Sequence, residues 1–282
     1  MLAQRIIIEI FILAVTFKQH QIMKKIVLII SFFITQSSFG QDLDKIETKL
    51  SEAFFKIQYW KFYDNAKTIE SYDSLEKAND QFEKLLLNIT SNNPQSLNYK
   101  FKSLIDSGLT ISSSADGNFR IYNWDTWTGG TMHIYKNIVQ YKASGKVFSK
   151  TLNNGKNNNG ESDCLYYEIN QVTSNNKNFY LAFSSARRSS WLFYLNIKVF
   201  SIDSNQLNDN AKLIKTRTGI RNQLGYEVDL SSSPNRNKKV PNFDIEYDKT
   251  NKVISIPVIL ENKEITNKKI RYKFNGTYFE KL

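Results

Sequence analysis

The segment Trp124–His133 (WDTWTGGTMH) gathers the residue types that most often do chemistry at a protein surface. It holds two tryptophans, the carboxylate of Asp125, threonine hydroxyls beside Gly129 and Gly130, and the imidazole of His133. Indole faces stack on sugar rings, and glycines at positive φ expose backbone N–H groups to an anion. One hypothesis is therefore a ligand-binding or catalytic rim at a turn between two strands. The alternative is an ordinary hairpin turn whose tryptophans, Trp124 and Trp127, serve in packing.

His133 is the single histidine after residue 40. Strand alternation puts Thr131, His133 and Tyr135 on one face, and Met132, Ile134 and Lys136 on the other. A general base needs a partner within hydrogen-bond reach, and Asp125 or Asp116 supplies one if the hairpin folds back. His133 and Asp125 are thus the catalytic candidates, with a purely structural histidine as the alternative.

Other catalytic and metal chemistry has little basis in the sequence. No G-x-S-x-G motif is present, and the single cysteine, Cys164, lies in an expected strand, where burial as a small apolar residue is favoured. One cysteine and one histidine after residue 40 exclude a structural zinc site in the mature form, no EF-hand spacing occurs, and no cofactor is expected. Acids on expected strands are candidates for the carboxylate pair of a glycosidase, and the alternative is that they form the charged solvent face of the sheet. These acids are Glu168, Glu227, Asp229, Asp244 and Glu246.

Positive charge is concentrated in the second part of the chain. The whole sequence has a formal net charge of +11, and residues 110–282 carry 25 basic against 15 acidic residues. Basic residues are densest between Lys212 and Lys239, and the binding candidates are Trp124, Trp127, Gly129, Gly130, Lys212, Lys215, Arg217 and Arg221. Such a patch suits an anionic envelope polymer, lipid head groups or an acidic protein, and a solvated basic surface is the alternative. No nucleic-acid motif is present, so nucleic acid is not an expected partner.

Residues 23–41 (MKKIVLIISFFITQSSFGQ) have the three parts of a bacterial export signal. Two lysines precede an apolar run, and a small-x-small site ends at Gly40. We expect translation to start at Met23 and cleavage to leave Gln41 as the N-terminus; the alternative is a longer anchor made from all 40 residues. No apolar run reaches the ~18 to 20 residues of a membrane-spanning helix, so we expect no transmembrane span in the mature form and a periplasmic or extracellular location.

The elements that carry these residues change type near residue 109. Residues 41–109 are expected to be helical, because apolar positions recur every three or four residues. Capping boxes are expected at Asp44 and Asp73, and a third helix from Pro94 to Gly108. Residues 110–282 are rich in Ile, Val, Tyr and Phe between turn-forming clusters, which predicts antiparallel strands. Hairpins are expected at 166–183 and 243–256.

The expected fold is therefore α+β: residues 1–40 as upstream extension and signal, 41–109 as a helical segment, and 110–282 as a mainly antiparallel β domain, sandwich-like or barrel-like, on which the helices pack. For function, the sequence favours a non-enzymatic binding protein that uses a basic, aromatic-bearing face of the β domain. A secreted hydrolase of glycan or peptide, with a site between Trp124 and His133, is the alternative. The sequence does not decide whether the protein is an enzyme.

Overall fold

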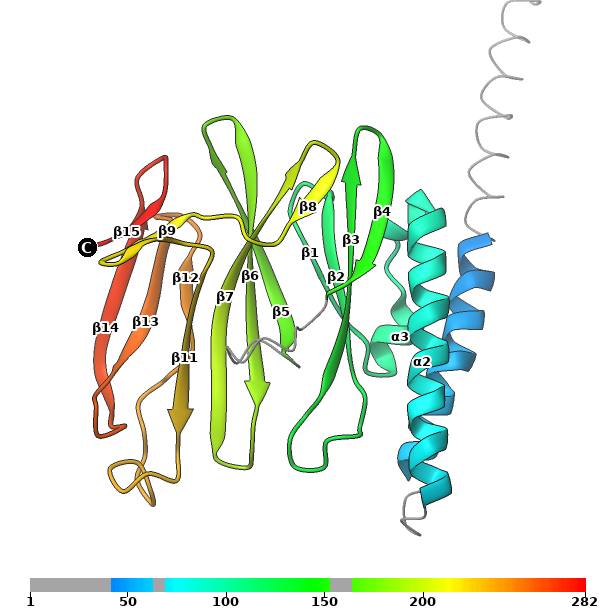
Figure 1. The fold of residues 1–282 in the computed structure, drawn as a ribbon, viewed down its shortest axis with the longest axis horizontal. Helices are drawn as coiled ribbons and strands as arrows, with labels where there is room; N and C mark the ends of the chain where they lie inside the picture. The colour runs from blue at the N-terminus through cyan, green and yellow to red at the C-terminus, as the bar shows by residue number, and fades with distance from the viewer. Residues whose placement is uncertain (1–41, 63–68, 153–163) are drawn as a thin grey trace, which may run out of the picture. The chain divides into compact units, whose positions relative to one another are not determined.

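The computed structural model describes residues 42–62, 69–152 and 164–282, and the chain divides into two compact units, Met1–Thr48 and Lys49–Leu282. The expected export signal lies outside the described residues. Helices come first and strands follow, as Figure 1 shows, which confirms the α+β prediction. The helical elements are a first helix at 42–62, α2 (Ile69–Asn92), the 3₁₀ turn η2 (Pro94–Leu97) and α3 (Lys102–Asp106).

The predicted periodicity correctly identifies the buried faces of the two long helices. Leu50, Phe54 and Ile57 are buried on the first helix, as are Leu75 and Phe82 on α2. The helices begin earlier than the predicted capping boxes, because the first helix already includes residue 42 and α2 begins at Ile69. Asp44 and Asp73 therefore lie inside helices, and the capping prediction was wrong at both places.

The predicted third helix is also wrong, because the chain breaks at Phe101. Phe101 adopts a left-handed conformation (φ 45°) between η2 and α3. This break lets the Phe101 ring lie fully buried with its centroid 6.0 Å from that of Tyr122. The exposed carbonyls of the break are satisfied by Arg120, which donates to the carbonyls of Ser96 (3.0 Å) and Tyr99 (2.6 Å).

Within the described residues the strands form three open sheets, all with antiparallel neighbours except for one parallel pair, β9 with β15. Sheet A has the order β1-β2-β3-β4, sheet B the order β11-β7-β6-β5 with β8 beside β7, and sheet C the order β10-β9-β15-β14-β13-β12. In sheets A and B the strands are β1 (Thr110–Ser113), β2 (Phe119–Asp125), β3 (Tyr135–Ala143), β4 (Lys146–Thr151), β5 (Leu165–Ser174), β6 (Lys177–Arg187), β7 (Leu192–Asp203), β8 (Gln206–Asn208) and β11 (Gln223–Asp229). In sheet C they are β9 (Ile214–Thr216), β10 (Gly219–Arg221), β12 (Glu246–Asp248), β13 (Val253–Ile259), β14 (Ile265–Phe274) and β15 (Phe279–Lys281). Both predicted hairpins are present, as β5–β6 and β12–β13.

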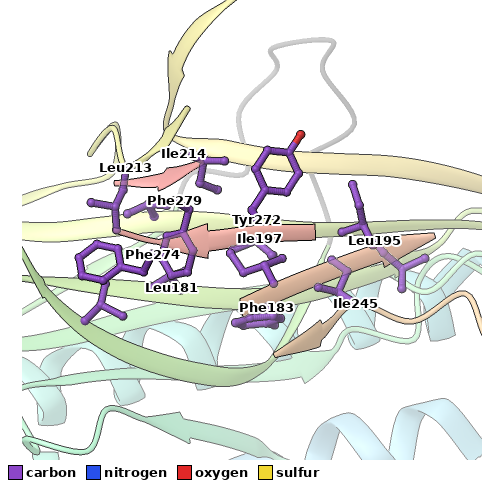
Figure 2. Close-up of a cluster of buried hydrophobic side chains, with 14 of the residues drawn as sticks. Leu181, Phe183, Leu195, Ile197, Leu213, Ile214, Ile245, Tyr272, Phe274 and Phe279 are labelled. Atoms are coloured by element: carbon purple, nitrogen blue, oxygen red, sulfur yellow. The ribbon is translucent and has the colours of Figure 1, made fainter. Parts of the chain in front are cut away.

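Sheet B lies between the other two sheets and is buried on both faces. Along β6, Tyr180 and Ala182 join a cluster with Phe119 of sheet A, whereas the alternate residues Leu181 and Phe183 join a second cluster with sheet C. Figure 2 shows this second cluster, in which side chains of β6 and β7 meet Tyr272, Phe274 and Phe279. The stacked arrangement matches the sandwich-like form of the prediction.

The helices of the second unit cover the outer face of sheet A. The ring of Phe82 on α2 meets the ring of Trp124 edge-on, with centroids 5.1 Å apart. At the other end of α2, the Gln140 side chain donates to the Thr90 carbonyl (2.7 Å). The connections between strands therefore lie at the ends of the strands, and the candidates Trp127, Gly129, Gly130 and His133 lie in the connection between β2 and β3.

Candidate functional site

Asp125 and His133 form a hydrogen-bonded pair at the β2–β3 connection. Asp125 ends β2 opposite Tyr135, the first residue of β3, and His133 precedes that residue by two positions. One carboxylate oxygen of Asp125 lies 2.5 Å from Nδ1 of His133, and the other accepts the Trp127 N–H at 2.8 Å. The side chains of Asp125 and His133 are 10% and 27% exposed. The carboxylate therefore fixes the orientation of a partly accessible imidazole.

Aromatic and cationic groups surround this pair. The rings of Tyr135 and Trp127 lie with centroids 6.1 and 6.0 Å from that of His133. Burial and the Asp125 carboxylate raise the pKa of Tyr135, against a smaller lowering by Arg187. Lys61, from the first helix, places Nζ 3.1 Å from the centroid of a Trp127 ring. The site therefore offers hydrogen-bonding groups, ring edges and cations within one small surface.

The opposite face of the same hairpin lines a groove of about 220 Å³ against α2. Ile134 and Lys136 point into it, which confirms the predicted alternation with His133 and Tyr135. Lys136 contacts carboxylate oxygens of Asp80 (2.7 Å) and Glu83 (2.6 Å). Burial lowers the pKa of Lys136, but these hydrogen bonds raise it by more, so its net shift is upward. The lining residues are Glu76, Asn79, Asp80, Thr126, Thr128, Ile134 and Lys136, so His133 does not open into this groove.

Trp124 is a core residue and does not belong to the binding surface. It is 1% exposed, and its indole N–H donates to the side-chain oxygen of Asn79 on α2 (3.0 Å). The expectation that Trp124 binds a ligand was therefore wrong, because the helices that cover sheet A bury its ring. Trp127 remains 40% exposed.

Gly129 and Gly130 build the turn that returns the chain toward β3. A Cβ on Gly129 would overlap the carbonyl oxygen of Met132, and Gly130 has φ +63° with open space around it. The Met132 N–H donates to the Gly129 carbonyl (3.1 Å), which closes the turn. The geometry of the turn thus explains why glycine stands at both positions, and the turn sets the path of the chain that leads to His133.

The predicted basic patch is divided between two places. Lys212, Lys215, Arg217 and Arg221 lie on or beside β9 and β10, before β11, whereas the basic residues of 231–239 follow it. The seven residues of β11 span roughly 20 Å at about 3.3 Å per residue. Lys215 also faces Glu280, with Nζ and a carboxylate oxygen 3.5 Å apart. One continuous patch from Lys212 to Lys239 is therefore not formed.

The second group of basic residues, within 231–239, lies on a surface built from connections between strands. Three hydrogen bonds link these connections to one another. The His133 N–H donates to the Arg187 carbonyl (3.2 Å), linking sheets A and B, and the Leu230 N–H donates to the Trp191 carbonyl (2.8 Å). The Asn235 side chain donates to the Lys263 carbonyl (2.9 Å), reaching the β13–β14 connection. We call this surface, made from residues 126–134, 187–191, 230–242 and 260–264, the loop end; its connections lie at the lower end of the sheets in Figure 1.

The loop end carries two exposed tryptophans, Trp127 and Trp191, of which Trp191 is 59% exposed. The cations in or beside it are Lys61, Arg187, Arg188, Arg236, Lys238, Lys239 and Lys263. Sequence reasoning missed Trp191, Arg187 and Lys61, because their contacts with Leu230, His133 and Trp127, respectively, depend on how the layers stack. The one sequence feature that could have indicated these residues is the pair Arg187-Arg188 close to Trp191.

The candidate carboxylates act mainly in local ion pairs and turns. Glu168 contacts Lys249 (2.9 Å), Glu246 contacts Lys269 (2.6 Å), and Asp229 accepts the Ser231 hydroxyl (2.6 Å). Hydrogen bonding to Ser231 lowers the pKa of Asp229, so it stays ionised. Within the described residues no group of three His, Cys, Asp or Glu side chains is placed to hold a metal, and Cys164 is buried.

No known family model matches the sequence, and no curated protein matches it significantly. Among the described residues, no helix combines the length and apolar character needed to cross a bilayer.

Proposed function

We propose that the chain is an exported, non-enzymatic binding protein that holds an anionic polymer of the cell envelope at its loop end. The observation that carries the proposal is the set of hydrogen bonds that joins connections of all three sheets around Trp127 and Trp191. Exposed indole rings provide apolar contact area for sugar rings, and Lys and Arg side chains pair with acidic groups. The signal-like segment at residues 23–41 supports export.

The charge of this surface favours a polymer over a small anion. Cations occur in each part of it, from Lys61 beside sheet A to Lys263 beside sheet C. The nearby acids Asp125 and Asp229 are held by His133 and Ser231, respectively, whereas Glu261 and Glu264 are exposed on either side of Lys263. An extended ligand with repeated negative charges contacts several of these cations at once, which a small anion does not.

The test measures binding of the full chain to immobilised polygalacturonate, with neutral dextran as control. We expect binding to polygalacturonate alone, weakened strongly as salt rises from about 0.1 M to about 1 M, because exposed charges are screened. The R187A/W191A variant should bind about tenfold more weakly, as expected for loss of an aromatic and an arginine anchor. K215A/R217A is the matched control, since it removes two cations beyond the other end of β11. No binding to any acidic polymer, or equal loss in both variants, contradicts the proposal.

Hydrolysis of glycan or peptide is the second candidate, favoured by one observation. The 2.5 Å contact between Asp125 and Nδ1 of His133 is the geometry that orients a general base. Among the described residues, however, no serine hydroxyl or cysteine thiol is hydrogen-bonded to His133, and the groove beside it is lined by the opposite face of the hairpin. Release of reducing ends or peptides by the native chain, abolished in H133A, supports hydrolysis; polymer binding retained by H133A without any such release supports the binding protein.

A further inference from the structure

The first helix presents an aromatic stripe to solvent. Phe55, Tyr59 and Phe62 are 61%, 48% and 70% exposed and follow one another at i, i+4 and i+7. Residues at these spacings lie on one face of a helix. Large apolar side chains that are exposed singly need no explanation, but three in one row on a helix mark an interaction surface. This surface adjoins the loop end at Lys61, which lies beside both Phe62 and Trp127, but its argument does not rest on the proposed function.

The stripe is the outward face of an amphipathic helix. Its opposite face is fully used in packing, because Leu50, Phe54 and Ile57 are buried and the Phe54 ring meets that of Phe82 with centroids 4.9 Å apart. Phe55 and Phe62 therefore point away from this packed face, and the exposed Tyr59 ring meets the edge of the half-buried Trp60 ring, with centroids 5.2 Å apart.

Lysines lie next to the aromatic stripe. Lys49 and Lys56 are exposed on the adjoining side of the helix, two turns apart. At the end of the helix, Lys61 Nζ lies 4.9 Å from the Phe62 ring centroid and 3.1 Å from that of Trp127. Between Lys49 and Phe62 the helix has three lysines, at 49, 56 and 61, against one acid, Glu52. Phe, Tyr and Trp rings beside lysine ammonium groups are the side chains that settle at the boundary between lipid head groups and acyl chains.

We propose that this stripe docks the protein on the surface of an anionic lipid bilayer, with Phe55, Tyr59 and Phe62 inserted among the head groups and the lysines paired with lipid phosphates. Charge favours this occupant over a second copy of the chain. A two-fold dimer through the stripe brings the same surface against itself, and so leaves its excess of lysines facing lysines. A layer of anionic head groups neutralises that excess.

The test uses two single-tryptophan additions to the full chain, F62W on the stripe and I220W on β10. Ile220 is 42% exposed and lies on the edge strand of sheet C, with sheets A and B between it and the helices. The probe is a vesicle of phosphatidylglycerol and phosphatidylcholine with brominated acyl chains, which quench tryptophan at short range. We expect F62W to gain a quenched component that I220W lacks, and this component to fall when phosphatidylglycerol is omitted.

A second variant, F55S/F62S, removes the apolar contact at exposed positions and should leave the fold intact, as its circular dichroism will report. Its affinity for the same vesicles should fall about tenfold or more, since each buried aromatic ring contributes strongly to transfer from water. Equal quenching of F62W and I220W, or unchanged vesicle affinity of F55S/F62S, overturns the proposal. A native dimer that dissociates on F55S/F62S substitution, without vesicle binding, overturns it in favour of a second copy.

Discussion

The side-chain amide of Asn123 pairs with both backbone groups of Tyr166, its oxygen accepting the Tyr166 N–H and its nitrogen donating to the Tyr166 carbonyl, each at 3.0 Å. Asn123 lies in β2 of sheet A and Tyr166 in β5 of sheet B, and both are buried. The Asn123 side chain thus makes the hydrogen bonds to Tyr166 that a neighbouring strand would otherwise make, at the place where sheets A and B meet. A buried peptide group left unpaired is costly, so this contact fixes how sheets A and B stack.

Replacing Asn123 with alanine should lower the free energy of unfolding by about 2 kcal/mol, because it leaves the buried Tyr166 N–H without a partner, whereas the Tyr166 carbonyl still accepts from the Ser112 hydroxyl (3.1 Å). Urea titration followed by circular dichroism measures this change. The control is Asn267→Ala, an exposed asparagine on β14, for which we expect a change within about 0.5 kcal/mol. Similar values for the two variants contradict this role of Asn123.

A second link between the same sheets makes stability depend on pH. Asp116, in the β1–β2 turn, accepts hydrogen bonds from the Ser114 hydroxyl (2.6 Å) and the Tyr180 hydroxyl of β6 (3.0 Å). Burial raises the pKa of Asp116, but hydrogen bonds from Ser114, Asn118 and Tyr180 lower it by more, so the net shift is below the ordinary value of 3.8. The stabilisation is therefore present above the unfolded pKa and is lost as pH falls through the lower folded pKa.

Asp116→Asn should be less stable than the native chain by about 1–2 kcal/mol at neutral pH, since it weakens hydrogen bonds to a charged acceptor. The difference should shrink as the pH is taken below about 4, where the native carboxyl becomes protonated. Urea titrations at several pH values measure it, with exposed Asp106→Asn as the control. A difference that stays constant down to acid pH shows that the charge of Asp116 contributes nothing.

The sequence patterns identify the long elements because those elements bury a regular face. The apolar repeats of the long helices were predicted, together with the two hairpins β5–β6 and β12–β13. The shortest strands, such as β1 and β8, were not predicted individually. Strands such as Thr110–Ser113 (TISS) have little apolar pattern of their own and depend on the neighbouring strand for their hydrogen bonds.

The candidate site was predictable only where its residues are close in sequence. The sequence left Asp125 and Asp116 open as partners of His133, and the structure pairs His133 with Asp125, which the hairpin brings back from eight positions away. The burial of Trp124 depends on Asn79, and the approach of Arg187 to His133 depends on how sheet A stacks on sheet B. Local spacing carries no information on either contact, so the sequence left Trp124 open between packing and binding and did not predict the approach of Arg187.

Trp127 has both a strained backbone and an exposed ring, so substitutions at this position should change stability and polymer binding independently. Its φ of +60° is a conformation that a bulky residue adopts at a cost of about 1–2 kcal/mol, whereas glycine adopts it freely. We expect W127G to be more stable than W127A by about 1 kcal/mol in urea titration. Both variants should bind polygalacturonate more weakly than the native chain, because both lose the ring that packs against Lys61. Equal stability of the two variants rules out strain at this position, and unchanged binding removes Trp127 from the loop-end surface.

Export predicts a defined N-terminus for the mature protein. The apolar run that ends at Ile34 and the Ser38-Phe39-Gly40 sequence predict cleavage before Gln41. Expression of the full chain in a bacterium that secretes its own proteins, followed by mass spectrometry of the N-terminal peptide from the extracytoplasmic fraction, measures the site. G40L should block cleavage, since the small side chain at the cleavage site is lost, and should leave a larger precursor associated with the membrane. If the native chain stays in the cytoplasm with residues 23–41 intact, the export proposal fails, and with it the expectation that the loop end meets an envelope polymer.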